Sequence, residues 1–285
     1  MMRRPARTAL HYAIAVVAIV LIVWAVRRWC IQSNVVDTNS MENSIYRNEC
    51  ILVNKLPVKN NPGRNRVVLF TSPLKGDSVN PPLFLSRCIG MPGDTILVGS
   101  ESYTVNGHDI PRPHRSLNSY FVSNNIAEVL FQEMKEEGIP TRDLEEGTYG
   151  FTLTLTSDEE TLLRKALPGI AGINFFARRI IPYQIIVPQK GRAYQMDDKM
   201  LTACWNAIMK ETNGEAVVEN GKLFIKGKEM DQFLFSEDYY WMLSDNVNDA
   251  VDSRKLGFVP ASDITGNALF IWYSKDKHRI FRKVD

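Results

Sequence analysis

The stretch from Ser244 to Arg254 reads SDNVNDAVDSR, and residues 257–260 follow it closely with GFVP. It stands between two strongly apolar runs, YYWML at residues 239–243 and ALFIWY at residues 268–273. Runs rich in β-branched and aromatic residues, bounded by polar segments, are typical of strands. We therefore expect this polar stretch to lie between two strands near the end of the chain.

Short apolar runs of the same kind recur earlier. Residues 51–53, 67–70, 95–98 and 103–105 are expected strands, and Asn106-Gly107 then signals a hairpin turn. A second Asn-Gly pair, at residues 220–221, precedes a further apolar run at 223–225. Strands are therefore expected towards both ends of the chain, and the fold class is mainly β.

The middle of the chain has helical patterns. Apolar residues at helical spacing predict helices over residues 126–136 and 201–209. Ser157 to Glu160 has the form of a capping box and predicts a third helix that starts there. The expected organisation is an antiparallel β core made of residues 30–107 and 236–285, with a mixed α/β insertion or cap domain at residues 108–235.

Composition narrows the class of protein. Hydrophobic residues make up 45% of the 285 residues and charged residues 23%, which fits a globular protein with one membrane helix. A net charge of +2 gives no reason to expect nucleic acid as a partner. The cysteines are scattered without the paired spacing of a zinc site, so we expect no metal, no cofactor and mostly free thiols at Cys30, Cys50, Cys88 and Cys204.

One segment has the length and composition of a membrane helix. Residues 9–26 read ALHYAIAVVAIVLIVWAV, and the run extends to residue 29, long enough to cross a bilayer. The arginines around it favour a cytoplasmic N-terminus at residues 1–8 and an exported C-terminal part. A cleavable signal peptide is the alternative, but such a peptide has a shorter apolar region that precedes its cleavage site. We expect an uncleaved, single-pass anchor over residues 9–29.

Five stretches resemble, in the same order, the sequence boxes of type I signal peptidases: 38–41, 50–55, 64–70, 86–94 and 244–260. The last is the most specific. The family pattern Gly-Asp-Asn-Arg-x-x-Ser-x-Asp-Ser-Arg, followed by Gly-Phe-Val-Pro, is kept except at Ser244, Val247 and Ala250. The resemblance implies a signal-peptidase-like serine endopeptidase fold, with the anchor followed by an antiparallel β core.

The resemblance also implies roles for individual residues. Ser40, directly before a methionine, holds the position of the nucleophile, and Thr38 holds the position that stabilises the oxyanion. Ser86 stands where the family has its general-base lysine. A serine hydroxyl does not titrate near neutral pH and cannot take over that task.

A second loss accompanies the first. Ala250 stands where the family has the serine that orients the lysine, while Asp252 and Arg254 keep the positions of a supporting ion pair. Asn43 also replaces a proline that is usual near the nucleophile. The chain is therefore expected to be inactive or weakly active, and whether it is an enzyme stays open.

A relocated base is the alternative route to activity. Lys55 and Lys75 are the candidates, and both are expected to be solvated surface lysines. The eukaryotic branch of the family uses a histidine as the base. None of the four histidines stands at that position; they are His11, His108, His114 and His278.

Three functions remain. The first is a degenerate signal peptidase related to signal-peptide cleavage, which binds signal peptides or exported preproteins or acts with an active signal peptidase paralogue. The second is a working signal peptidase that uses Ser40 with a relocated base. The third is a non-enzymatic structural subunit of an envelope complex. In each case the expected location is the inner (cytoplasmic) membrane, in contact with the lipid bilayer, with the main domain extracytoplasmic.

Overall fold

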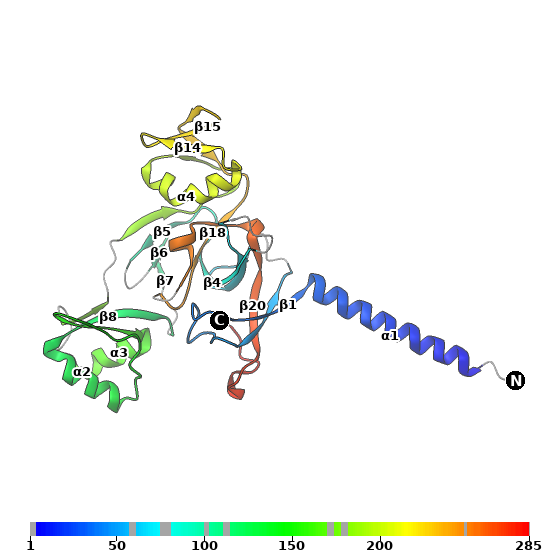
Figure 1. The fold of residues 1–285 in the computed structure, drawn as a ribbon, viewed down its shortest axis with the longest axis horizontal. Helices are drawn as coiled ribbons and strands as arrows, with labels where there is room; N and C mark the ends of the chain where they lie inside the picture. Colours follow the sequence, from blue (N-terminus) through cyan, green and yellow to red (C-terminus); the bar gives the residue numbers. More distant parts are fainter. Residues whose placement is uncertain are drawn as a thin grey trace.

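The computed structural model describes residues 4–56, 61–74, 81–99, 103–110, 115–169, 174–177, 182–247 and 250–284. It begins with one long helix, α1 (Arg4–Trp29), which projects away from the rest of the molecule (Figure 1). Within these residues, the segment His11–Trp29 is long and apolar enough to cross a membrane, with a mean hydropathy of 1.9. The expected N-terminal apolar helix is therefore present.

The central element is a seven-stranded antiparallel sheet in the order β1-β2-β20-β3-β4-β18-β19. Its strands come from two distant parts of the chain. The early strands are β1 (Ile31–Val35), β2 (Cys50–Asn54), β3 (Val67–Thr71) and β4 (Leu83–Gly90). The late strands are β18 (Tyr239–Leu243), β19 (Val259–Pro260) and β20 (Ile264–Tyr273).

Both faces of this sheet are covered by apolar side chains. Along β3, Val67 and Leu69 point into one buried cluster, whereas Val68 and Phe70 point into another. This alternation is what a strand's two-residue repeat produces when both faces are buried. Most of β4 is buried, so the residues near Ser86 lie within the core.

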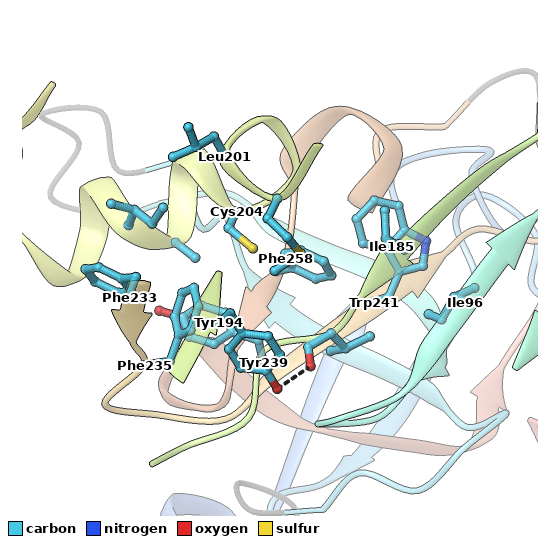
Figure 2. Packing of buried hydrophobic residues seen from close by; sticks show 14 of the residues in the cluster. Ile96, Ile185, Tyr194, Leu201, Cys204, Phe233, Phe235, Tyr239, Trp241 and Phe258 are labelled. Carbon is cyan, nitrogen blue, oxygen red and sulfur yellow. Dashed lines mark hydrogen bonds between the residues drawn. The ribbon is translucent and has the colours of Figure 1, made fainter. Parts of the chain in front are cut away.

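A second sheet lies beside the first, in the order β12-β5-β6-β7. Its strands are β5 (Thr95–Val98), β6 (Tyr103–Val105), β7 (His108–Ile110) and β12 (Tyr183–Ile186). Helix α4 (Asp198–Glu211) packs against β12 and contributes Leu201 and Cys204 to the core drawn in Figure 2, which also holds aromatic residues such as Tyr239 and Phe258. Further strands complete this part: β13 (Ala193–Gln195), β14 (Ala216–Glu219), β15 (Lys222–Ile225), β16 (Lys228–Met230) and β17 (Gln232–Leu234).

A third sheet forms a separate lobe with two helices (Figure 1). Its strand order is β11-β8-β10-β9, and its core packs helices α2 and α3 on one face of the sheet. The elements are β8 (Leu117–Ser123), α2 (Asn124–Glu136), β9 (Glu145–Gly147), β10 (Gly150–Thr156), α3 (Ser157–Ala166) and β11 (Phe175–Ala177). The placement of the domain boundary at residues 108 and 235 stays a prediction.

The mainly β prediction is confirmed, with 38% strand against 27% helix. Both Asn-Gly pairs form hairpin turns with positive φ, at 54° and 81° for Asn106-Gly107 and at 51° and 75° for Asn220-Gly221. One detail was wrong: the capping box of α3 is Thr156 with Glu159, one residue before the expected start. Strand β10 ends at Thr156, so this hydroxyl is the one placed to accept the backbone N–H.

Candidate active site

Ser40 lies in a tight turn that follows β1. The turn is closed by backbone hydrogen bonds from Glu42 and Ile45 to the carbonyls of Asn39 and Met41. Met41 and Ile45 are fully buried under the central sheet, and they anchor the turn in place. Asn43 adopts a φ of 71°, which proline cannot adopt, so the absence of the usual proline matches the shape of this turn.

The hydroxyl of Ser40 is nearly buried, with 8% of the residue exposed. Its Oγ lies 3.0 Å from Oγ1 of Thr38. Within the part of the chain that the structure describes, Thr38 is the one side chain that hydrogen-bonds to this hydroxyl. Ser40, at the nucleophile position, and Thr38, at the oxyanion position, are thus in direct contact.

Asp245 and Asn246 lie against this turn. The backbone N–H of Asn246 donates to the carbonyl oxygen of Ser40 at 2.9 Å, and the Asn246 amide donates to Asn39 at 3.2 Å. The Ser44 hydroxyl donates to Oδ2 of Asp245 at 2.5 Å. The structure therefore brings together two segments that are far apart in the sequence, since Ser44 and Asp245 are separated by 201 positions.

Ser86 lies in β4 and is completely buried. Its Oγ is 3.0 Å from Oγ of Ser244, which is 3% exposed. One of these hydroxyls donates to the other, which reduces the cost of burying two polar groups. Ala250, only 5% exposed, adds a methyl group and no hydrogen-bonding atom. The described site therefore contains hydroxyls but no amine at the position of Ser86.

Asp252 connects this pair to Arg254. Its Oδ2 accepts the backbone N–H of Ser244 at 2.9 Å, and its two oxygens accept Nε and Nη2 of Arg254 at 2.9 and 2.7 Å. Partial burial lowers the pKa of Arg254, but the hydrogen bonds and charge of Asp252 raise it by more, so the guanidinium stays charged. Asp252 also caps the short helix α5 (Ser253–Leu256). The expected ion pair is thus part of the frame that holds Ser244.

Of the two candidates for a relocated base, Lys55 lies within the described residues and is bound to another group. The Nζ of Lys55 donates to the carbonyl of Arg28, at the end of α1, at 2.7 Å. His11 lies in α1, and His108 and His278 are exposed on β7 and on the 3₁₀ turn Lys277–Arg279. Lys75 and His114 fall outside the described residues.

Comparison with known proteins identifies the family. The family model described as signal peptidase, peptidase S26, matches residues 9–153 and 186–273, which include most of α1, the Ser40 turn and all of the central sheet. The chain belongs to the signal peptidase family.

Curated signal peptidases support this assignment over most of the chain. "Signal peptidase I" of Buchnera aphidicola subsp. Baizongia pistaciae is 22% identical over 270 residues, covering 89% of this chain and 73% of the relative. "Signal peptidase I" of Aquifex aeolicus is 26% identical over 263 residues, covering 90% and 81%. "Signal peptidase I S" of Bacillus subtilis (strain 168) is 29% identical over 114 residues, covering 39% of this chain and 58% of the relative.

One prominent interaction of this signal peptidase family member, a buried ion pair between Arg87 and Asp245, was not predicted from the sequence. Arg87 donates through Nε and Nη2 to both oxygens of Asp245, at 2.9 and 2.6 Å, and both side chains are 2% exposed. Its Nη1 also donates to the carbonyl of Asn65 at 2.8 Å. An arginine inside the apolar strand LFLSRCIG is a signal that could have found it, because a buried charge needs a partner.

Proposed function

We propose that this chain is a membrane-anchored signal peptidase family protein that engages exported preproteins but cleaves them poorly or not at all. The observation that carries the proposal is the buried hydrogen bond between Ser86 and Ser244. In the family pattern these two positions hold lysine and glycine, so the lysine amine has been replaced by two small side chains that bond to each other. This pair offers Ser40 no proton acceptor near neutral pH.

The size of the expected defect follows from the chemistry of serine proteases. Removing the base or the nucleophile from such an enzyme costs on the order of 10⁶ in turnover, as in subtilisin. A buried lysine amine can act as a base because burial lowers its pKa. Ala250 removes the hydroxyl expected to orient that amine, so a lysine at position 86 alone would lack its hydrogen-bond partner.

Anchoring in the inner membrane is part of the proposal. The His11–Trp29 segment supplies the spanning helix, and the arginines before it favour a cytoplasmic N-terminus with the β core outside. Strand β1 begins two residues after α1 ends, and Lys55 holds the last turn of α1 to the end of β2. The Ser40 turn follows β1 directly, which would keep it near the bilayer that presents the preprotein.

Two alternative functions can be distinguished from this proposal by the experiment described below. A working peptidase would need a base other than Ser86 near Ser40, and the amine of Lys55 is already bound to the Arg28 carbonyl. A structural subunit of an envelope complex would bind no preprotein. An active signal peptidase paralogue is the partner that a binding-only protein would serve.

The test restores the missing groups in steps. The full-length protein is reconstituted in lipid vesicles with a preprotein, and cleavage is measured for wild type and for Ser86→Lys with Ala250→Ser. A third version adds Ser244→Gly, because the Ser244 hydroxyl occupies the space 3.0 Å from Ser86 Oγ. The matched control is the triple variant carrying Ser40→Ala.

We expect no measurable cleavage by wild type and cleavage by the triple variant that disappears with Ser40→Ala. The double variant should cleave less than the triple variant because Ser244 still crowds the lysine. Wild-type cleavage that is abolished by Ser40→Ala alone would show that a relocated base works. No cleavage by any version, together with no crosslinking of the preprotein, would leave the structural role.

A further inference from the structure

A cavity of about 810 Å³ opens beside α5, between α4, β5 and β12. It is within the size range of sites that bind small molecules. Its lining includes three cationic side chains, Lys199, Arg254 and Lys255, and the apolar or aromatic side chains of Leu97, Tyr183, Ile185 and Trp241. The cavity therefore offers both positive charge and apolar surface to a ligand.

Arg254 is fixed in place at the cavity. Its Nε and Nη2 are held by Asp252, which is completely buried and is held in turn by the backbone N–H of Ser244. Its Nη1 has no hydrogen-bond partner among the described residues, and 27% of the side chain is exposed. A guanidinium held this way loses little rotamer freedom when it binds an anion, which favours affinity.

Apolar and aromatic side chains line part of the cavity wall. Leu97 is 43% exposed and Tyr183 37% exposed, and both line the cavity with Ile185 and Trp241. Burial raises the pKa of Tyr183, while Arg254 lowers it; the result is a raised value, so the phenol keeps its proton. The wall therefore offers apolar surface together with a neutral hydroxyl.

Trp241 also lines the cavity, and its indole N–H can report on a ligand bound there. Only 4% of the residue is exposed, and its indole Nε1 has no hydrogen-bond partner within the described residues. The ring packs edge-on against Phe258, with centroids 5.1 Å apart, and in Figure 2 its nitrogen lies on the side away from Phe258.

The charge of the lining selects the type of anion. Lys199, Lys255 and Arg254 stand against the carboxylates of Asp198 and of Asp252, which leaves one positive charge in excess. A monoanion would neutralise this excess, whereas a dianion would overcompensate it beside Asp198. A planar carboxylate also matches the fork of a guanidinium.

We infer that this cavity binds a monoanionic carboxylate attached to an apolar body, with the carboxylate at Arg254 and Lys255 and the body against Leu97 and Tyr183. Two sources share this chemistry: a fatty acid and the carboxyl end of a peptide with an apolar last residue. The inference goes beyond the proposed function, because it requires neither Ser40 nor cleavage.

The test uses the full-length protein in a non-ionic detergent. Binding of N-acetylphenylalanine, its amide and octanoate is measured by calorimetry, and the ¹⁵N-labelled indole N–H signals are followed by NMR, with Trp241→Phe to assign the peak. The variant is Lys199→Gln with Lys255→Gln, which leaves the Arg254–Asp252 pair intact. Lys135→Gln, an exposed lysine on α2 in the separate lobe, is the matched control.

We expect at least one of the two carboxylates to bind and to shift the Trp241 indole signal, while N-acetylphenylalaninamide binds roughly tenfold more weakly or not at all. The double variant should lose roughly tenfold in affinity, and Lys135→Gln should lose none. Octanoate binding alone points to the fatty acid source, and N-acetylphenylalanine binding alone points to the peptide source. Equal binding of acid and amide, binding unchanged in the double variant, or binding of neither carboxylate would overturn the inference.

Discussion

Replacing Asp245 by asparagine should reveal how strongly the Arg87–Asp245 pair holds the Ser40 region together. The change keeps the shape of the side chain but removes its charge, so a guanidinium that is 2% exposed loses its counter-ion. The hydrogen bonds to Arg87 Nε and Nη2 and to the Ser44 hydroxyl are weakened at the same time. Breaking a buried ion pair in this way costs about 3–5 kcal/mol.

That cost is a large share of the stability of a typical domain, which is about 5–15 kcal/mol. For a domain of this size it corresponds to a fall in melting temperature of roughly 10 °C. The assay is thermal denaturation of the full-length protein in detergent, followed by near-ultraviolet circular dichroism, which reports on buried aromatic residues such as Tyr240 and Trp241.

The control is Glu215→Gln, which breaks the exposed pair between Glu215 and Lys226, whose side chains are 51% and 72% exposed. Exposed pairs contribute little, so this variant should melt within about 2 °C of wild type. If Asp245→Asn also melts within about 2 °C of wild type, the reasoning that the pair is required inside the core is refuted.

Two further predictions follow from titratable groups. Burial raises the pKa of Glu49, but hydrogen bonds from Arg279, from the Tyr46 N–H and from Ser274 outweigh it, so the pKa lies below its ordinary value. The stabilisation is complete above the ordinary carboxyl pKa and is lost as the pH falls through the lowered pKa. The stability difference between wild type and Glu49→Gln should therefore shrink on acidification; a difference constant with pH contradicts this. Burial also raises the pKa of the Cys88 thiol to about 12. At about pH 8 iodoacetamide should therefore label the half-buried Cys50 much faster than Cys88, which peptide mass mapping would measure. Equal labelling rates would be inconsistent with a buried thiol at Cys88.

Much of the fold could be read from local patterns. The Asn-Gly pairs predicted their hairpins because left-handed φ values favour these residues, and the apolar runs predicted strands β2, β3, β5 and β6. Strand β1 was missed because Ile31–Val35 contains three polar residues in five, and pairing with β2 rather than its own composition makes it a strand. The start of α3 at Ser157 was predicted, but its capping residue was off by one, because hydroxyl residues at 156 and 157 each precede a glutamate by three positions.

The residues of the candidate site could also be predicted from the sequence, whereas their contacts could not. Each residue was predicted singly, because it stands in a short box of recognisable residues. The contacts between them were not, since Ser86 and Ser244 are 158 positions apart, as are Arg87 and Asp245. The cavity beside Arg254 left no sequence signal at all, because its walls come from α4, α5 and two strands of another sheet.

The sequence by itself determined that this is a signal peptidase family chain with an apolar N-terminal helix, a mainly β fold and a serine at the position of the family's lysine. It did so through residues that identify themselves locally. Only the tertiary structure decided that Ser244 fills the site beside Ser86 and hydrogen-bonds to it. Burial is the physical reason: two distant hydroxyls removed from water must find partners inside the protein, and the folded chain places them against each other.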